Sequence, residues 1–365
     1  MNPKVIYLWV VLTTLVSCGK KDYVPSVGVS GETIRFGMPG VVIEAENKMR
    51  ASGPVNVFPS NTSFGVLGYC LANTGDSNNE LDMNTGSVEW GTKAPRSTPH
   101  LFYKTEIKYN GAGCYYTGEQ KRWYEPENFL YTFFAYYPYA GDYYTVTPTS
   151  QDGMGIPKLK FSMPFDTEDV EIPLEVGDIP DAMLAASVDV MRGDGHVYLE
   201  FNHLLTGLNF EANNYNEEKE LVIHGLRMKG EFYKTIEVTL GGGYAYSSEI
   251  YKGTFAFLDV DDSADDVTIE HHQTGVKVGD KTLMLISNLN AVPYLGNNIG
   301  LYVDYTVNGE NKTNEYIGNV ANFMPIAGTI YTVQLNFIGN SFVLHFVVDN
   351  NQTWEEGGES DITFK

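Results

Sequence analysis

The chain has 365 residues, of which 43% are hydrophobic and 13% are aromatic, and this composition argues against a disordered protein. Its length exceeds that of one typical domain and is sufficient for two hydrophobic cores. A formal net charge of −22 argues against nucleic acid as a partner, because phosphate groups demand clustered Lys and Arg side chains. We therefore expect a folded, acidic protein that binds no nucleic acid.

The N-terminus carries an export signal. After Lys4, residues 5–16 form an apolar run, which is shorter than the roughly 20 residues that a bilayer-spanning helix needs. The run fits the hydrophobic part of a signal peptide over residues 1–17. It ends in the sequence Leu-Val-Ser-Cys-Gly at 15–19, which resembles the bacterial lipobox and implies that Cys18 is acylated after cleavage. Several acyl chains would hold the protein on the outer membrane. The alternative is an ordinary signal peptide in which Cys18 is incidental.

Two further cysteines follow, Cys70 and Cys114. An oxidising compartment would allow them to form a disulfide, but their separation along the chain is as consistent with two buried free thiols. Neither has a nearby His that would indicate a nucleophile or a metal site. The sequence leaves both states of the pair open.

Beyond the signal peptide, the pattern predicts strands and turns almost throughout. Residues 18–50 combine a polar tether with two short β-like pieces, at 33–36 and 41–43. Residues 129–137 form a dense aromatic run, and its short length favours a buried strand over a helix.

Near the C-terminus, residues 331–337 and 342–348 each alternate apolar with polar side chains on either side of Gly339-Asn340, which predicts a β-hairpin. Helical periodicity is scarce, while 37 glycines and 16 prolines punctuate the chain. Such punctuation is typical of sandwiches and barrels, so we expect an all-β fold.

A turn-rich stretch at 191–195 comes just before an alternating strand that begins at Val197. It marks the predicted domain boundary. The mature chain then divides into an N-terminal sandwich over 51–192 and a C-terminal sandwich over 193–365.

Few residues point to catalysis or metal binding. The motifs of α/β-hydrolases, zinc proteases and P-loop proteins are missing from the sequence. His271 and His272 are neighbours, which on a strand point to opposite faces and so suit one metal poorly. Five aspartates within 259–266 could hold calcium, but a solvated loop is the simpler explanation. We expect no catalytic residue, no cofactor and no metal, and therefore no enzyme.

Several short segments, taken in order, resemble the fimbrillin family, the subunits of type V pili on Gram-negative outer membranes. These segments are the lipobox at Cys18, the strand at Ile34 followed by 49–51, then 133–139, 180–185, 199–205 and 325–331, with Trp354 near the end. They extend over nearly the whole chain. The resemblance implies two transthyretin-like β-sandwich domains in tandem, in agreement with the strand pattern and the midpoint break.

The resemblance also implies a route of assembly. In this family an Arg-specific protease removes the first strand of the lipoprotein precursor, and a strand from the next subunit fills the groove. The matching bond here is Arg50–Ala51, in a polar segment that suits cleavage. The removed strand would carry Ile34, Phe36, Val41, Val42 and Ile43. The implied partners are other pilin subunits, and the implied location is first the outer membrane and then the cell-surface fimbrium.

The donor strand would come from the C-terminal tail, where Ile362 and Phe364 alternate with polar residues. An alternative function is a cell-surface lipoprotein that never polymerises and binds glycan or host protein on exposed aromatic rings. The aromatic pairs at 115–116, 123–124 and 143–144 suggest this alternative. Such residues also pack in the cores of β-sheets, which is the commoner explanation.

Overall fold

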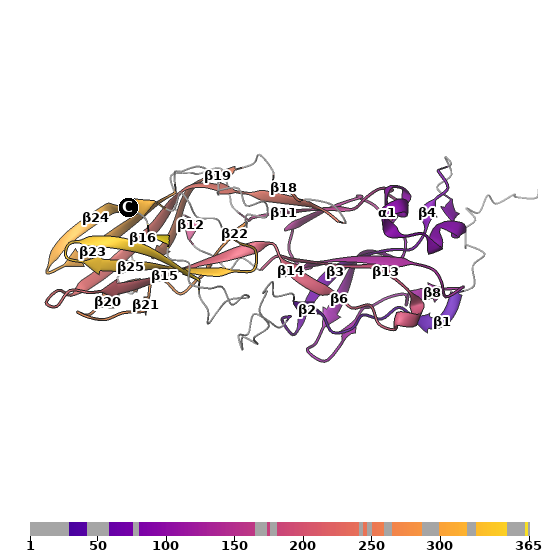
Figure 1. Ribbon diagram of the computed structural model, residues 1–365, viewed down its shortest axis with the longest axis horizontal. Coiled ribbons are helices and arrows are strands. Elements are labelled where there is room, and N and C mark those ends of the chain that lie inside the picture. The colour runs from indigo at the N-terminus through magenta and orange to yellow at the C-terminus, as the bar shows by residue number, and fades with distance from the viewer. Residues whose placement is uncertain are drawn as a thin grey trace, which may run out of the picture.

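The computed structural model describes residues 29–41, 58–75, 80–164, 174–175, 181–240, 244–246, 250–258, 265–286, 299–319, 326–348 and 362–363. These residues form an elongated molecule with two lobes made almost entirely of β-strands (Figure 1). The expected all-β fold is confirmed. Within this described part there is one short α-helix, α1 (Trp90–Lys93), and no helix that is long and apolar enough to cross a bilayer.

A seven-stranded sheet forms the centre of the N-terminal lobe. Its strand order is β2 (Gly40–Val41), β14 (Glu200–His203), β13 (Met183–Val190), β9 (Tyr131–Tyr137), β3 (Thr62–Tyr69), β6 (Phe102–Tyr109) and β7 (Cys114–Tyr115). Neighbouring strands are antiparallel except β14 and β2, which are parallel. The aromatic run predicted to be a buried strand is β9, in the middle of this sheet, and that prediction is confirmed.

The two faces of this sheet contact different cores, because successive side chains of a strand point to opposite sides. On one face, Phe133 packs in a core that we call the N-lobe core, over which β1 (Val29–Thr33) pairs with β8 (Arg122–Tyr124). On the other face, Phe134 belongs to a core that continues into the C-terminal lobe. The N-lobe core includes Ile34, Phe36, Phe64, Phe102, Trp123, Val197 and Phe201.

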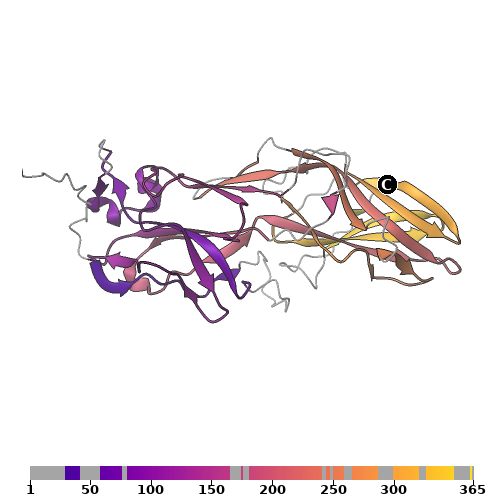
Figure 2. The same cartoon turned by 180° about the vertical axis from the view of Figure 1, so that it is seen from behind.

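A four-stranded sheet joins the two lobes. Its order is β10 (Tyr144–Thr147), β11 (Lys158–Ser162), β17 (Thr235–Thr239) and β18 (Tyr244–Tyr246). The first two strands come from the N-terminal half of the chain, whereas β17 directly follows β16 (Leu221–Tyr233), a long strand of the C-terminal lobe (Figure 2). A small two-stranded sheet, β4 (Ala72–Asn73) with β5 (Leu81–Asp82), lies outside these sheets. The mixed sheet and the continuous core make the two lobes one packed body.

Two six-stranded sheets form the C-terminal lobe. The first has the order β12 (Leu174–Glu175), β19 (Ile250–Leu258), β16, β23 (Gly300–Val307) and β24 (Glu310–Asn319), with β20 (Val267–Ile269) also on β16. The second has the order β21 (Val276–Lys277), β15 (Leu205–Asn214), β25 (Ile330–Ile338), β26 (Ser341–Val348) and β27 (Ile362–Thr363), with β22 (Leu283–Ile286) also on β15. The predicted hairpin is β25–β26 and is confirmed, and Gly339 at its turn has a φ of +65°, which glycine adopts without strain.

The predicted boundary at residue 192 falls inside the seven-stranded sheet of the N-terminal lobe. Strands β13 and β14 flank a 3₁₀ turn at Arg192–Asp194 and pair with each other, with Ala185 opposite Phe201. After β12, which pairs with β19 of the C-terminal lobe, the chain returns to the N-terminal lobe with β13 and β14 and enters the C-terminal lobe again with β15, at Leu205. The turn-rich stretch therefore connects two strands of one sheet, and its composition is the same as that of a linker between domains.

The two cysteines are both free. Cys70 comes just after β3, close to the first residue of β6, because Gly68 of β3 pairs with Phe102. Cys114 lies beside the last residue of β6, because it pairs with Tyr109. Because a strand advances about 3.3 Å per residue, the eight residues of β6 hold the two thiols far apart. A disulfide needs Cα atoms within about 7 Å, so the pair cannot form in this fold.

This separation leads to a labelling prediction. Burial raises the pKa of the Cys70 thiol to about 12 and that of the Cys114 thiol to about 11. Since the thiolate is the reactive form, we expect slow alkylation of both near about pH 8, with Cys114 accelerating as the pH rises and Cys70 labelled only after unfolding. Timed alkylation followed by mass spectrometry, on protein that starts at residue 19, measures both rates. Recovery of a disulfide-linked peptide containing both cysteines would contradict this structure.

Candidate functional site: a buried amino-terminal segment

Residues 29–41, which we call the plug segment, are paired with the rest of the N-terminal lobe along their length. The first part, β1, runs antiparallel to β8, and the Ile34 amide donates to the Lys121 carbonyl at 2.8 Å. The partner then changes, and the Gly37 amide donates to the Val197 carbonyl at 2.9 Å. The last part, β2, is parallel to β14 at the edge of the seven-stranded sheet.

The apolar side chains of the plug segment enter the N-lobe core. Ile34 is 0% exposed and Phe36 is 4% exposed, whereas Met38, further along, is 60% exposed. The Phe36 ring contacts Phe102 and Phe133 edge-on, with centroids 5.5 and 5.8 Å away. Burying side chains of this size is worth about 1.5–3 kcal/mol each. The segment is therefore part of the core and not a loose arm.

Polar contacts fix the backbone of the plug segment. The Tyr116 hydroxyl donates to the Ile34 carbonyl at 3.1 Å and accepts from the Lys121 amide at 3.1 Å. The Arg122 guanidinium donates to the Gly31 carbonyl at 2.9 Å. The two bonds of the Tyr116 hydroxyl satisfy partly buried backbone groups, whereas the bond to Gly31 lies at the exposed surface.

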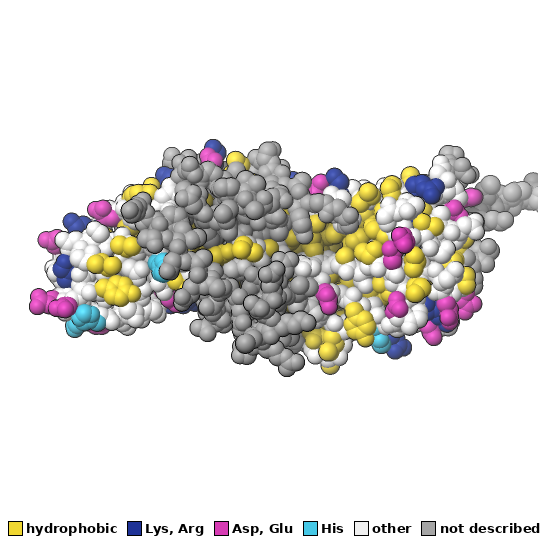
Figure 3. All heavy atoms as spheres, in the orientation of Figure 1, with side chains coloured by type: hydrophobic (Ala, Val, Ile, Leu, Met, Phe, Trp, Pro, Cys, Tyr) yellow, Lys and Arg dark blue, Asp and Glu magenta, His cyan; other side chains and the backbone are white. Residues whose placement is uncertain are grey.

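An ion-pair cluster around Arg192 holds the start of the plug segment. The Arg192 Nε atom is 2.9 Å from Glu32 Oε2, and its Nη1 atom is 3.6 Å from Glu125 and 3.8 Å from Glu127. The hydrogen bond from Arg192, together with its charge, lowers the pKa of the Glu32 carboxyl. Acidic side chains gather over β1 and β8 at this end of the molecule (Figure 3).

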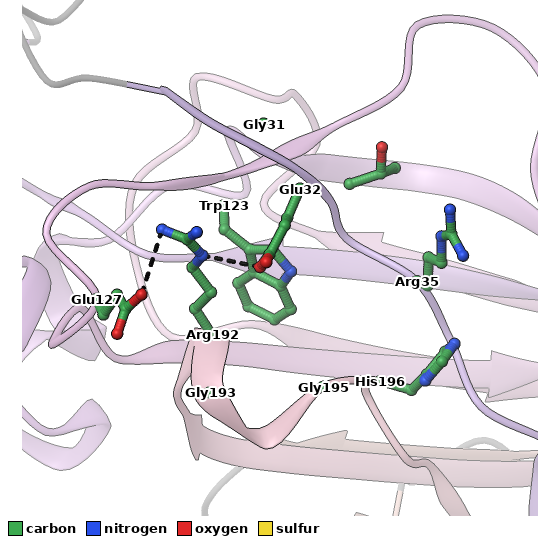
Figure 4. Close-up of a pocket in the computed structure, with 10 residues that line it drawn as sticks. Gly31, Glu32, Arg35, Trp123, Glu127, Arg192, Gly193, Gly195 and His196 are labelled. Carbon is green, nitrogen blue, oxygen red and sulfur yellow. Dashed lines mark hydrogen bonds and ion pairs between the residues drawn. The ribbon is translucent and has the colours of Figure 1, made fainter.

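A cavity of about 580 Å³ opens between the plug segment and the turn that carries Arg192. Trp123 lies at the centre of the site, with the Arg192 cluster on one side and Arg35 and His196 on the other (Figure 4). Much of the lining comes from the plug segment itself. The cavity therefore marks the seam along which this segment meets the rest of the lobe.

The structure brings together only part of the predicted site. Ile34 and Phe36 lie in the core, and Val41 is half-buried against it. Other residues of that prediction lie outside the described part of the chain, namely Cys18, Val42, Ile43, Arg50, Ala51 and Phe364. Ile362 is in β27, where it pairs with Phe346 of β26, in the lobe opposite the plug segment (Figure 1).

The aromatic pairs that suggested glycan binding are mostly involved in packing. Trp123 is 2% exposed and meets Tyr131 edge-on at 4.7 Å, so its faces are closed to a sugar. Tyr143 and Tyr144 pack against Phe161. Among the described residues, no group of three or more His, Cys, Asp and Glu side chains could hold a metal ion.

Sequence reasoning missed the residues that hold the plug segment from outside. Arg192 is 160 positions from Glu32, and Tyr116 is 82 positions from Ile34. No local pattern links residues so far apart, because only the folded sheet brings them together. A search for charged residues that could pair with Glu32 would not have singled out Arg192 among the 24 Lys and Arg residues.

Together, the all-β architecture and a buried first segment define a two-lobed β-protein whose N-terminal strand completes its core. Comparison with known proteins agrees with this class. The family model described as fimbrillin-like matches residues 50–350, so the chain belongs to the fimbrillin-like family. A search of curated protein sequences found no match.

A protein of known structure shares this fold. A fimbrial protein from Bacteroides vulgatus shares 16% identity and a TM-score of 0.59, over 88% of this chain and 99% of that one, which establishes a common fold. The fimbrial anchor protein Mfa2 from Porphyromonas gingivalis shares 11% identity over 86% and 97% of the two chains, with a TM-score of 0.35. A fimbrial assembly protein from Parabacteroides distasonis shares 9% identity over 91% and 100%, with a TM-score of 0.38.

Membership of this family confirms the resemblance noted from the sequence. It places the chain among the structural proteins of cell-surface fimbriae, which assemble with other fimbrial subunits and are not enzymes.

The packing of the plug segment yields a stability prediction. Phe36→Ala removes a ring from the N-lobe core and should lower the free energy of unfolding by about 3–5 kcal/mol, as for other buried Phe residues. The matched change Met38→Ala, at a side chain in the same segment that is 60% exposed, should have little effect. Urea denaturation of both variants measures the difference. Equal stability of the two variants would show that Phe36 contributes nothing to the core.

Proposed function

We propose that this protein is a fimbrial subunit that is exported as a lipoprotein, loses its plug segment to proteolysis, and polymerises by donor-strand addition. The observation that carries the proposal is that Ile34 and Phe36 are core residues although they precede Arg50. Cleavage at Arg50–Ala51 would disconnect these residues from the chain that they stabilise. It would also release the subunit from a lipid at Cys18.

Removal of the plug segment would leave an apolar slot lined by Phe102, Phe133 and Val197. An unfilled slot beside unpaired strand backbone is an aggregation hazard, which explains why the precursor carries its own strand. A strand from another subunit can restore both the backbone hydrogen bonds and the buried side chains.

The C-terminal tail has the right pattern for that strand. Ile362-Thr363-Phe364 repeats the spacing of Ile34-Arg35-Phe36, an isoleucine and a phenylalanine separated by one polar residue. Side chains two apart on a strand share one face, so both triplets present the same two groups. Strand β27 of the tail lies in the C-terminal lobe, whereas the plug segment lies in the N-terminal lobe (Figure 1). Head-to-tail contacts of this kind generate open filaments.

The processing step predicts one cleavage product. When protein comprising residues 19–365 is treated with an Arg-specific protease, we expect a product that begins at Ala51, because 42–57 separates the plug segment from the body of the lobe. Arg50→Gln should block this cut, while Arg35→Gln, at a position inside the plug segment, should leave it unchanged. N-terminal sequencing and intact mass identify the product. A main cut elsewhere would refute processing at Arg50.

The assembly step predicts dependence on the tail. Processed protein should form ladders of oligomers, and the double variant Ile362→Ser with Phe364→Ser should remain monomeric, because it cannot refill the slot. Thr363→Ser is the matched control and should polymerise as the unmodified protein does. Size-exclusion chromatography with light scattering measures the outcome. Processed, unmodified protein that stays monomeric would rule out a stalk subunit, and polymers of the double variant would exclude the tail as donor.

A further inference from the structure

A tyrosine beside the slot covers one glycine of the plug segment. In residues 197–199, just before β14, Val197 and Leu199 are buried, whereas Tyr198 between them is 62% exposed, as alternation along an extended chain requires. On the plug segment, Phe36 is buried, and Gly37 therefore faces outward. The Gly37 amide donates to the Val197 carbonyl at 2.9 Å, which holds the two backbones side by side. The tyrosine and the glycine thus share the outer face of the lobe.

The Tyr198 ring leaves no room for a side chain at Gly37. A Cβ atom placed on this glycine would lie 2.5 Å from Cε1 and 2.6 Å from Cδ1 of the ring, whereas carbon atoms in contact are normally about 3.5–4.0 Å apart. The other two glycines of the plug segment differ, because a Cβ on Gly31 would meet nothing within 4 Å and one on Gly40 would lie 3.8 Å from Glu200. The backbone of Gly37 does not adopt the left-handed conformation that favours glycine. The ring is therefore the reason why glycine is needed here.

We propose that Tyr198 makes the slot selective for a strand with glycine at the position of Gly37, so that the plug segment is preferred over a strand from another subunit. This inference rests on the proposed function, because it concerns the exchange of those two strands. An aromatic ring packed over a glycine in a sheet supplies contacts that the glycine cannot make itself. With the ring in place, the slot fits a strand with the pattern of residues 34–37, which is isoleucine, any residue, an aromatic residue and glycine.

The C-terminal tail does not have this pattern. When the tail enters in the direction of the plug segment, its isoleucine and phenylalanine take the places of the same residues in the plug, and Lys365 falls at the position of Gly37. When it enters in the opposite direction, the two apolar residues exchange places and Asp361 falls there. In both directions a charged side chain meets the Tyr198 ring. The ring must then leave its place before the tail can fill the slot.

The Tyr198 ring slows this exchange without preventing it. The residue is already 62% exposed, and the nearby His196 ring is 6.4 Å away between centroids, so the ring can turn into solvent without leaving a buried pocket. What it loses is its packing on Gly37. The plug segment is therefore held after cleavage until a tail displaces it, and the apolar slot stays covered during this interval.

The preference for glycine is tested first in uncleaved protein (residues 19–365), where no exchange takes place. Gly37→Ala should lower the folding equilibrium constant about fivefold more in otherwise unmodified protein than in Tyr198→Ala protein, because the new methyl group meets the ring only in the former. Gly31→Ala, in the same segment but in open space, is the matched control and should have the same effect in both backgrounds. Urea denaturation measures all four combinations. Equal effects of Gly37→Ala in the two backgrounds would overturn the proposal.

The exchange itself is measured with a peptide of the tail. The acceptor is processed protein that carries Ile362→Ser and Phe364→Ser, so that only an added peptide can fill the slot. The probe is a fluorescent peptide of residues 359–365, and its uptake is followed by fluorescence anisotropy. We expect Tyr198→Ala in the acceptor to speed uptake several-fold, because it weakens the hold on the plug segment and frees space for the incoming side chain. Tyr215→Ala, at another exposed tyrosine, should leave the rate unchanged.

Two glycine variants of the peptide test the selection. Lys365→Gly should enter the unmodified slot about fivefold faster if the tail runs in the direction of the plug segment, and Asp361→Gly should do so if it runs the other way. Either gain should vanish in the Tyr198→Ala acceptor. Uptake with no gain from either glycine would overturn the selection. Coupling in the precursor together with no uptake of any peptide would refute the tail as donor and leave the preference for glycine standing, so the two failures are distinguishable.

Discussion

The N-terminal lobe depends on the burial of Ile34 and Phe36 by a segment that precedes the rest of the domain. The Phe36 ring lies among rings contributed by β3, β6 and β9, and Ile34 belongs to the same core. Backbone hydrogen bonds hold the segment on either side. Because main-chain bonds and apolar contacts make few demands on sequence, this arrangement supports the proposal that a strand with the same spacing could occupy this place. The N-terminal lobe thus draws part of its core from a segment at the start of the chain.

Much of this fold could be read from the sequence where the signal is local. The aromatic run that became β9 and the hairpin at Gly339 are set by residues within one strand or one turn. The alternation of Ile34 and Phe36 with polar neighbours is a local signal of the same kind, and both side chains are buried. The state of Cys70 and Cys114 could not be read, because it depends on which ends of β3 and β6 lie together.

The predicted boundary at residue 192 differs from the point where the sheets change for a physical reason. Turn-rich sequence shows that the chain reverses direction, but a reversal inside one sheet has the same composition as a link between lobes. The contact between Arg192 and Glu32 was beyond sequence reasoning for a related reason, since β13, β14 and β1 are brought together only by the completed lobe. Long-range pairing thus determines both the lobe boundary and the surroundings of the candidate site.

The long strand β16 and its continuation β17 bear on how a filament of this protein would carry load. The two strands follow one another in the chain, and they belong to a sheet of the C-terminal lobe and to the four-stranded sheet that joins the lobes. Interstrand hydrogen bonds lie across the strand direction, so tension along the long axis shears many of them at once instead of opening them one by one. A fibre that joins such bodies end to end would resist pulling through the whole ladder, which suits attachment under flow.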